Sequence, residues 1–397
     1  MKILILSANT GEGHNSSARA IMRNMEERGI EVQLTDVLSI ASKRVSNNIS
    51  KAYVGSTEVN IFPRLYLIGK WISDHMNHIR TSPIYLLNKL YWGRLNRYIK
   101  EGNYDAVVAL HLFAAESLTA IKRQGELKIP AFFVMTDYTI HPFIAETDLE
   151  YYIIPHKDLI PTYTKRGMKA ENIYPIGIPV NEFKFMHKLD KLTARHDIIE
   201  KMNWNVEGDE NSIQIEEQAI TDGKWYLVMS GSMGFGDMTS LLKIFAERIG
   251  EHDRIICVCG NNQKTYNNIQ TTFADDHRIL PVGYTKQVHL LMDACDVILT
   301  KPGGVTTTET FVKNMPIIHT APISAIEKEN AQFCQEHGMS VFSTDLQEQV
   351  ELAIRLANDE QERQQMMKHQ RENITPNTAT KIVNLILKVI KRRNTNK

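Results

Sequence analysis

The sequence predicts an α/β protein built from two doubly wound domains, each a parallel sheet with helices on both faces. Three observations support this fold class. Short, fully apolar runs alternate with amphipathic stretches, as expected for strands buried on both sides of a parallel sheet. The alternation restarts near the middle of the chain, and 397 residues suit two or three domains of ordinary size. Glycine-containing turns follow several apolar runs, as they do where a strand leads into a helix.

The first series of apolar runs predicts six strands, and the second series predicts six more. The first series covers 3–6, 32–34, 106–110, 131–135, 152–154 and 173–176. The second covers 225–229, 255–259, 278–282, 297–300, 317–319 and 340–342. Pro179 follows the last strand of the first series, so we expect one domain over 1–179 and another over 180–375.

Three further segments complete the predicted organisation. A helix is expected over 191–202, and the acidic, polar stretch 205–222 is expected to be a solvated loop before the second sheet. Pro376 begins a last amphipathic helix over 376–397, which ends in a basic run.

The composition is that of an ordinary globular protein. Hydrophobic residues make up 43% and charged residues 23%, which excludes a disordered or fibrous chain. Lys and Arg equal Asp and Glu at 46 each, so the net charge does not indicate a nucleic-acid partner. The cysteines lack paired CxxC spacing, and we expect them to be reduced thiols in the core. They are Cys257, Cys259, Cys295 and Cys334.

No apolar segment approaches the roughly 18 residues of a membrane span. The apolar stretch at 1–6 is too short for a signal peptide. We therefore expect the protein to stay in the cytoplasm and to meet a membrane only at its surface.

The first strand leads into Asn9-Thr10-Gly11-Glu12-Gly13-His14 and then an Ala-rich helix. Glycines let the backbone approach a ligand, and a helix N-terminus favours negative charge. A dinucleotide fingerprint would need a third glycine at Ser16, so NAD binding is disfavoured. A histidine at the carboxyl edge of the sheet is placed to act as a general base. A histidine whose ring only forms hydrogen bonds with the backbone would give the same sequence pattern, so this alternative stays open.

Two glycine turns of the second half suit a nucleotide. The run Ser230-Gly231-Ser232-Met233-Gly234-Phe235-Gly236-Asp237 offers backbone N–H groups to phosphate, but it lacks the lysine of a Walker loop. The second turn, at 301–304, is followed by Glu309, whose carboxylate could accept both hydroxyls of a ribose.

These motifs together resemble glycosyltransferase family 28, in the branch of monogalactosyldiacylglycerol synthases and processive diacylglycerol glucosyltransferases. The resemblance rests on Gly11, Gly13, His14, Ser17 and Ala18, on Thr136-Asp137 with His141-Pro142, on the Gly-Ser-Met-Gly loop, and on Pro302-Gly303-Gly304 with Glu309. It implies the GT-B fold, with two Rossmann-like domains facing a central cleft and a C-terminal helix crossing back to the first.

The resemblance also implies a UDP-sugar donor and its contacts. It assigns Gly231, Ser232, Met233 and Gly234 to the diphosphate, the backbone of Gly283, Tyr284 and Thr285 to uracil, Gly303, Gly304 and Glu309 to the nucleotide turn and ribose, and Glu329 and Asn330 to the donor sugar. Peptidoglycan glucosaminyltransferases carry Gln-Gln at the last pair, so the identity of the sugar stays open.

We expect an inverting mechanism that uses no metal and no cofactor. The chain has no pair of aspartates two positions apart, so the cation-binding DxD motif of the other large glycosyltransferase fold is missing. Loop amides and helix dipoles would then stabilise the leaving UDP. His14, or Asp137 directly or as its partner, is expected to remove the acceptor proton, with Gly11, Gly13 and His141 on the acceptor side. A structural role for Asp137 stays open.

Although the net charge of the whole chain is zero, the segment 43–100 is basic. Ten basic residues there oppose Glu58 and Asp74, a net charge of +8, and eight Tyr, Trp and Phe residues are interleaved. Aromatic and basic residues together suit an anionic membrane surface. They could also bind single-stranded nucleic acid or form a solvated helical face, but no nucleic-acid module accompanies them.

The predicted activity is transfer of a hexose from UDP-glucose or UDP-galactose to diacylglycerol, at the cytoplasmic face of the membrane. Repeated addition to the product stays open. The alternatives are a lipid-linked peptidoglycan-precursor N-acetylglucosaminyltransferase, a GT-B UDP-sugar 2-epimerase and a non-catalytic nucleotide-sugar sensor.

Overall fold

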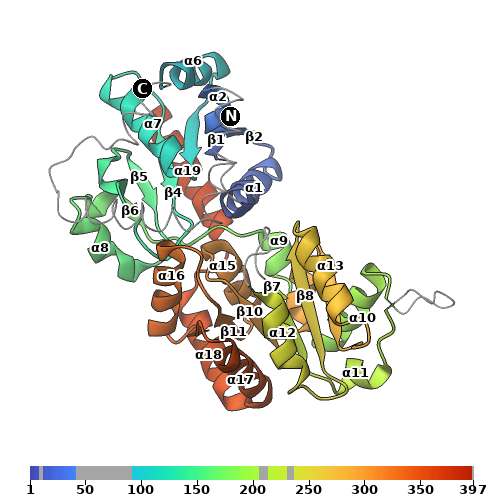
Figure 1. Ribbon diagram of the computed structural model, residues 1–397. Helices are drawn as coiled ribbons and strands as arrows, with labels where there is room; N and C mark the ends of the chain where they lie inside the picture. Colours follow the sequence, from blue (N-terminus) through green and yellow to red (C-terminus); the bar gives the residue numbers. More distant parts are fainter. Residues whose placement is uncertain (9–11, 42–91, 205–212, 230–236, 396–397) are drawn as a thin grey trace. The chain divides into compact units, whose positions relative to one another are not determined.

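The computed structural model describes residues 1–8, 12–41, 92–204, 213–229 and 237–395, which form two compact units (Figure 1). The first unit comprises 1–182, 324–326 and 375–397, and the second comprises 183–323 and 327–374. The contacts thus divide the chain after Glu182, whereas the sequence analysis placed the boundary after Pro179.

A parallel sheet of six strands, in the order β2-β1-β3-β4-β5-β6, forms the centre of the first unit. Its strands are β1 (Lys2–Ser7), β2 (Glu31–Asp36), β3 (Ala106–Ala109), β4 (Ala131–Val134), β5 (Tyr151–Ile153) and β6 (Ile173–Tyr174). Its helices include α1 (Glu12–Glu26), α2 (Val37–Ala41), α6 (Trp92–Gly102), α7 (Leu112–Arg123), α8 (Ile160–Thr164) and α19 (Thr378–Thr395). Every residue of β3 and β4 is buried, as the apolar runs predicted.

The second unit repeats this architecture with the order β12-β11-β10-β7-β8-β9, again all parallel. Its strands are β7 (Trp225–Met229), β8 (Arg254–Gly260), β9 (Ile279–Gly283), β10 (Val297–Thr300), β11 (Ile317–His319) and β12 (Val341–Phe342). Its helices include α10 (Lys191–Lys201), α11 (Glu217–Thr221), α12 (Met238–Ala246), α13 (Gln263–Thr272), α14 (Val288–Ala294), α15 (Gly304–Lys313), α17 (Leu346–Asn358) and α18 (Glu360–Asn373). Two helices contain a point where the chain changes unit, α9 (Glu182–Phe185) and α16 (Ala325–Glu336).

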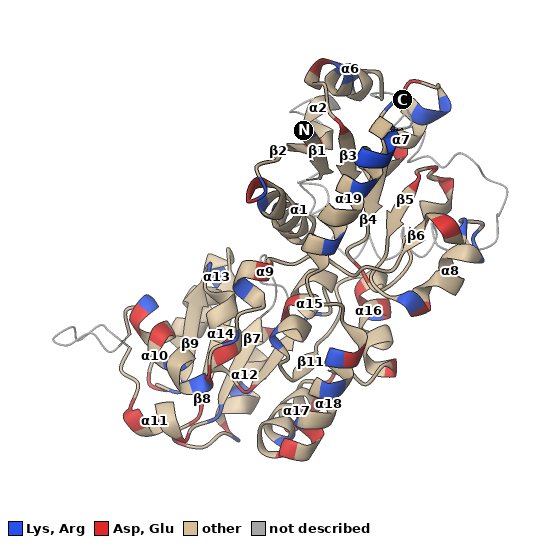
Figure 2. Ribbon diagram, turned by 180° about the vertical axis from the view of Figure 1, so that it is seen from behind, with Lys and Arg blue, Asp and Glu red and all other residues tan. Residues whose placement is uncertain are grey.

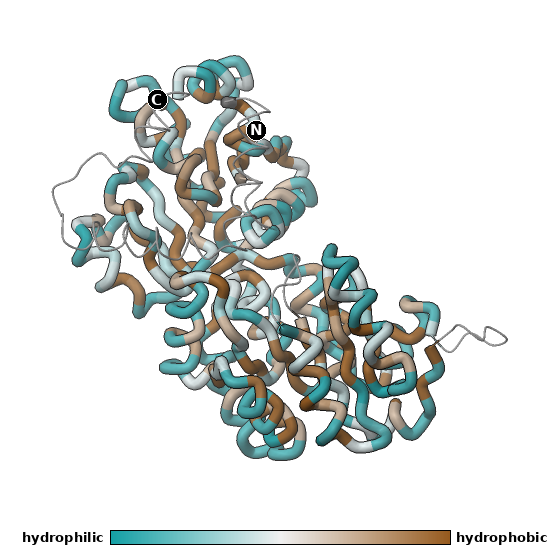
Figure 3. Tube along the Cα trace, viewed as in Figure 1, coloured by the Kyte–Doolittle hydropathy of each residue, from teal (hydrophilic) through white to brown (hydrophobic). Residues whose placement is uncertain are grey.

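The twelve predicted strands are confirmed, and so are the four buried, unpaired cysteines. Charged residues lie mainly on helices and loops, and the inner strands of both sheets are mainly hydrophobic (Figures 2 and 3), whereas the edge strand β2 also carries polar residues. This distribution is the one expected when helices cover both faces of a sheet. Among the described residues, no helix is long and apolar enough to cross a membrane.

One predicted loop is wrong in its second part. Within 205–222, residues 217–221 form α11, and Ala219 and Ile220 are buried. Both carbonyls accept hydrogen bonds from buried side chains, since Trp225 donates to Ala219 over 2.8 Å and Arg195 donates to Ile220 over 2.6 Å. Ile215, just before the helix, is buried as well, so three apolar residues within an acidic stretch hold this helical turn against the core. Residues 205–212 lie outside the described part.

The last helix, α19, belongs to the core of the first unit although the chain reaches it only after the second unit. It packs against α1, and Figure 1 shows the two helices side by side. Ile382, Val383 and Ile386 are fully buried beside Ile21 of α1. Burying such a side chain contributes about 1.5–3 kcal/mol, so α19 is a substantial part of this core.

The strand orders fix where a ligand can bind in each unit. In an open α/β sheet, ligands occupy the carboxyl edge at the point where the strand order reverses. That point lies between β1 and β3 in the first unit and between β7 and β10 in the second. The segments that follow these strands therefore hold the candidate site residues.

Candidate functional site

A cluster of polar side chains lies at the carboxyl edge of the first sheet, where β1, β3 and β4 are neighbours. His14 stands in the first turn of α1, and Thr136 follows β4. The Nδ1 atom of His14 lies 3.0 Å from the Thr136 Oγ1 atom. Ser7 fixes this turn to β1 by donating a hydrogen bond to the Asn15 Oδ1 atom over 2.7 Å. The ends of two strands therefore position the histidine that the sequence analysis selected as a base.

Asp137 and His141 form a second pair on the loop that follows β4. The Nε2 atom of His141 lies 3.0 Å from the Asp137 Oδ2 atom, and the two side chains are 21% and 15% exposed, respectively. Asp137 thus contacts His141, whereas His14 contacts Thr136 and also forms a hydrogen bond with the Leu110 backbone. Asp137 acts on His14 through its charge.

His111 is the residue of this cluster that sequence reasoning missed. It follows β3 and is the N-cap of α7, where its Nδ1 atom accepts a hydrogen bond from the Phe113 N–H over 3.2 Å. Its ring centroid lies 5.0 Å from that of His14, with the two planes at 80°. A polar residue between a buried strand and an apolar helix is an N-cap signal, and it was visible in the sequence.

Burial keeps both histidines of the ring pair neutral. It lowers the pKa of His14 below its ordinary value; the charge of Asp137 opposes this shift and His141 adds to it. Burial also holds the pKa of His111 well below its ordinary value, and the positive charges that His14 and His141 can carry act in the same direction. A neutral imidazole at pH 7 can accept a proton, which is what a general base requires.

In the second unit, α15 begins directly after a glycine turn at the end of β10. Gly303 is the N-cap of α15 and supplies no side-chain hydrogen bond, and Gly304 is the first residue of the helix. The helix N-terminus therefore presents backbone N–H groups without a capping side chain, a suitable arrangement for phosphate.

Two side chains of α16 hold this glycine turn. Glu327 forms an ion pair with Lys301, whose Nζ atom lies 3.4 Å from the position that a Cβ atom on Gly303 would take. The Asn330 amide is fully buried and donates a hydrogen bond to the Pro302 carbonyl over 3.0 Å. Asn330 therefore contacts the turn itself, and its neighbour Glu329 is the more accessible member of the predicted sugar-binding pair.

Glu309 lies on α15 beyond the turn and is partly buried. Burial raises the pKa of Glu309 to about 8, against an opposing effect of Lys184. Lys184 itself donates a hydrogen bond to the Lys286 carbonyl over 3.2 Å. The Glu309 carboxyl group is therefore poised between its two protonation states near neutral pH.

The remaining predicted residues occupy different surroundings. Gly283 ends β9, Tyr284 is 59% exposed, and the Thr285 hydroxyl accepts a hydrogen bond from the Gln287 N–H over 3.0 Å. Gly13 is exposed in the first turn of α1. The predicted residues Gly11, Gly231, Ser232, Met233 and Gly234 lie outside the described residues.

Two family models match successive halves of the chain. The model of monogalactosyldiacylglycerol (MGDG) synthase matches residues 14–180, and that of the glycosyltransferase family 28 C-terminal domain matches residues 226–386. A similar curated protein is the processive diacylglycerol beta-glucosyltransferase of Bacillus licheniformis. It is 25% identical over 373 residues, which cover 92% of this chain and 89% of that protein.

Solved structures share the fold at lower sequence identity. MurG of Acinetobacter baumannii superposes with a TM-score of 0.63 at 15% identity, covering 98% of this chain and 99% of that one. The UDP-GlcNAc 2-epimerase of Neisseria meningitidis, bound to UDP-GlcNAc, gives a TM-score of 0.62 at 12% identity, with coverage of 98% and 100%. At these identities the likeness establishes the GT-B fold alone.

Proposed function

We propose, from the premise that this chain belongs to glycosyltransferase family 28, that it transfers a hexose from a UDP-sugar to diacylglycerol and inverts the sugar at C1. One observation carries the proposal. The segment that matches the MGDG synthase model, 14–180, contains the whole cluster of His14, His111, Thr136, Asp137 and His141. The relatives named processive diacylglycerol beta-glucosyltransferase support the same acceptor and the same class of donor.

In the proposed reaction, a hydroxyl oxygen of diacylglycerol forms a bond to C1 of the sugar while the bond from C1 to the diphosphate oxygen breaks. His14 takes the hydroxyl proton, because its neutral ring lies at the carboxyl edge of the sheet. The negative charge of Asp137 then stabilises the imidazolium. UDP leaves with the electron pair of the broken bond.

The donor would bind the second unit, without a metal. The N–H groups at the start of α15, together with 231–234, would hold the diphosphate. Glu309 would accept the two ribose hydroxyls, and the backbone of 283–285 would contact uracil. Glu329 would contact the sugar directly, whereas Asn330 would act by fixing Pro302.

The alternative activities have less support. The likeness to MurG and to the 2-epimerases concerns the fold, whereas the relatives matched over most of the chain are diacylglycerol glucosyltransferases. The peptidoglycan-precursor and epimerase alternatives are therefore not favoured.

Labelled UDP-glucose and UDP-galactose, each incubated with diacylglycerol vesicles, test the proposal. We expect a labelled hexosyl-diacylglycerol from at least one donor, resolved by chromatography. Parallel reactions contain UDP-GlcNAc alone, and UDP-GlcNAc with a lipid-linked peptidoglycan precursor. Turnover confined to either parallel reaction would contradict the proposal and identify the competing activity.

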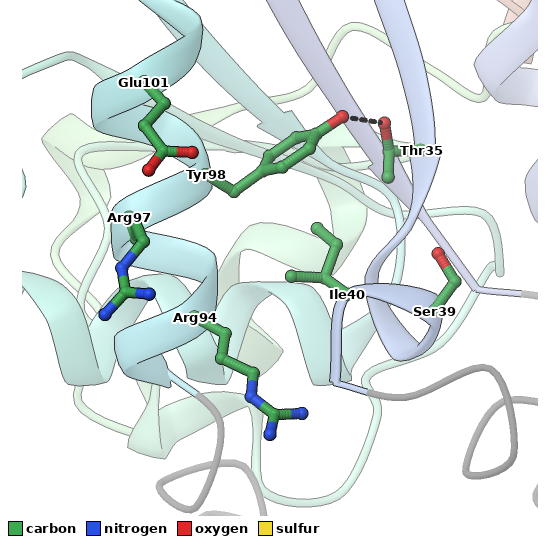
Figure 4. Close-up of a pocket in the computed structure, with 7 residues that line it drawn as sticks. All are labelled: Thr35, Ser39, Ile40, Arg94, Arg97, Tyr98 and Glu101. Carbon is green, nitrogen blue, oxygen red and sulfur yellow. Dashed lines mark hydrogen bonds between the residues drawn. The ribbon is translucent and has the colours of Figure 1, made fainter.

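We also propose peripheral docking at an anionic membrane through the basic segment. Residues 42–91 of that segment lie outside the described part, but its end forms α6, on which Figure 2 shows basic residues. Lys100 is already paired with Glu126. Arg94 and Arg97 are exposed. Together with Tyr98, whose hydroxyl lies 3.1 Å from the Thr35 Oγ1 atom, they line a hollow of about 520 Å³, and Figure 4 shows these side chains. The hollow is lined by Thr35, Ser39, Ile40, Arg94, Arg97, Tyr98 and Glu101.

Replacing Arg94 and Arg97 with glutamine should lower partition onto vesicles that contain phosphatidylglycerol by about 10- to 30-fold, because each basic residue near such a surface contributes about 1 kcal/mol. Co-sedimentation measures this effect. The control, Lys243→Gln with Lys264→Gln, removes the same charge from exposed positions of the second unit. Equal partition of the two double variants would contradict docking through α6.

A further inference from the structure

We propose that His111 is a positioning residue for the catalytic base: it holds the His14 ring in the orientation in which that ring receives the acceptor proton. The inference rests on the proposed function, because it concerns the residue assigned as the base. It adds a third strand end, that of β3, to the two that already position His14.

The backbone fixes His111 before any ligand binds. The residue has extended dihedral angles, φ −139° and ψ 146°, at the N-cap of α7, and the preceding Leu110 N–H donates to the Leu6 carbonyl of β1 over 2.9 Å. The ring makes two contacts with Phe113. Its Nδ1 atom accepts the Phe113 N–H, and its centroid lies 4.6 Å from that of the Phe113 ring. The position and tilt of the imidazole are therefore set by the first turn of a twelve-residue helix.

This hydrogen bond also sets the chemical state of His111. Because Nδ1 accepts a hydrogen bond from the Phe113 N–H, the neutral ring carries its proton on Nε2. Protonation of Nδ1 would break the helix cap, and burial of the ring opposes the charge as well. His111 is thus a neutral ring that does not compete with His14 for the acceptor proton.

The contact with His14 is edge to face. The ring centroids are 5.0 Å apart and the planes lie at 80°, one of the favoured geometries for two aromatic rings. Hydrogen bonds with Thr136 and with the Leu110 backbone hold the His14 ring, and the His111 ring packs against it edge to face. Small errors in the placement of a reacting group are costly, and a shift of about 1 Å can lower a rate by about 10²-fold.

The charged groups around His14 determine how loss of His111 would be detected. Burial lowers the pKa of His14 most, Asp137 and the hydrogen bond with the Leu110 backbone raise it, and His141 lowers it. Removing the His111 ring admits water to His14, so the pKa of His14 should rise toward its ordinary value. The low-pH limb of the kcat profile, which reports loss of the neutral base, should then move to higher pH.

The test compares His111→Asn with His111→Ala. Asparagine keeps an N-cap acceptor and removes the ring, whereas alanine removes both. We expect His111→Asn to melt near the wild-type temperature, to keep the KM for UDP-sugar and to lose about 10- to 100-fold in kcat. His111→Ala should show the same loss together with a lower melting temperature.

The control is His156→Asn. His156 is also an N-cap histidine, more deeply buried than His111, and its Nδ1 atom accepts a hydrogen bond from the Asp158 N–H over 3.2 Å. It should retain kcat, which separates the loss of the His111 ring from the general effect of replacing a capping histidine.

Titration of His14 by NMR in the wild type and in His111→Asn needs no substrate. It therefore tests the inference even if the wild type transfers no sugar, an outcome that would defeat the proposed function alone. An unchanged His14 titration, or a kcat for folded His111→Asn within twofold of wild type, would overturn the positioning role.

Discussion

Replacing His14 with alanine is expected to lower the rate of hexose transfer by about 10²- to 10⁴-fold, the usual contribution of a general base. The reason is the position of its ring, held 3.0 Å from the Thr136 hydroxyl at the carboxyl edge of the first sheet. Donor binding should persist, because the nucleotide turn and Glu309 belong to the other unit. Single-turnover transfer to diacylglycerol vesicles, with UDP affinity measured by calorimetry, checks both statements.

The pH dependence of the wild type is part of the same expectation. Since burial lowers the pKa of His14, the base is already neutral at pH 7. The kcat value should therefore stay level as the pH falls from 7, until the pH drops below the ordinary range of histidine.

His141→Ala is the variant to compare with His14→Ala, because it removes the contact of His141 with Asp137 but leaves the Thr136 contact of His14 intact. Equal rates for wild type and His14→Ala would reject His14 as the base and direct attention to the Asp137–His141 pair.

The strands could be predicted from the sequence because helices cover both faces of each sheet. A strand covered on both faces is apolar throughout, and turn residues bound it, so strands such as β3 and β4 stood out as isolated apolar runs. The edge strand β2 has no buried residue, and only Val32 and Leu34 marked it. The same reasoning failed at 217–221, where only Ala219 and Ile220 are buried and the surrounding acidic residues dominate the pattern.

The candidate site was harder to predict, because its residues meet through the order of the strands. Sequence reasoning placed His14 and Asp137 at strand ends, but it did not predict that β3 lies between β1 and β4. That order brings His111 against His14. Asn330 illustrates a different limit. Its predicted contact with the sugar stays a prediction, and the hydrogen bond from its buried amide to the Pro302 carbonyl, which depends on how α16 packs, had no signal in the sequence.

Replacing Glu309 with alanine should weaken UDP binding by about 10- to 100-fold at pH 9, because hydrogen bonds to a charged group contribute about 1.5–3 kcal/mol each. The proposed role needs the ionised carboxylate, which can accept hydrogen bonds from both ribose hydroxyls. In the free protein the pKa of this group is raised to about 8 by burial, so at pH 6 or 7 most molecules must release a proton when UDP binds.

The affinity of the wild type for UDP should therefore rise with pH, by up to tenfold per unit below pH 8, and level off above it. Glu309→Gln matches the side chain in size, and its affinity should vary with pH only through the titration of the UDP phosphate at about pH 6, which the wild type shares.

The stability of the unligated protein should change with pH in the opposite direction. The pKa of Glu309 is higher in the folded protein than in the unfolded chain, so the unligated wild type loses stability as the pH rises from the ordinary glutamate range through 8. Glu309→Gln should have a higher melting temperature than the wild type at pH 9, and the difference should close toward pH 4.

Calorimetry of UDP binding, in buffers of different ionisation enthalpy, counts the proton that Glu309 releases. An affinity for UDP that is independent of pH in the wild type would mean that the carboxyl group does not bind the ribose as an anion.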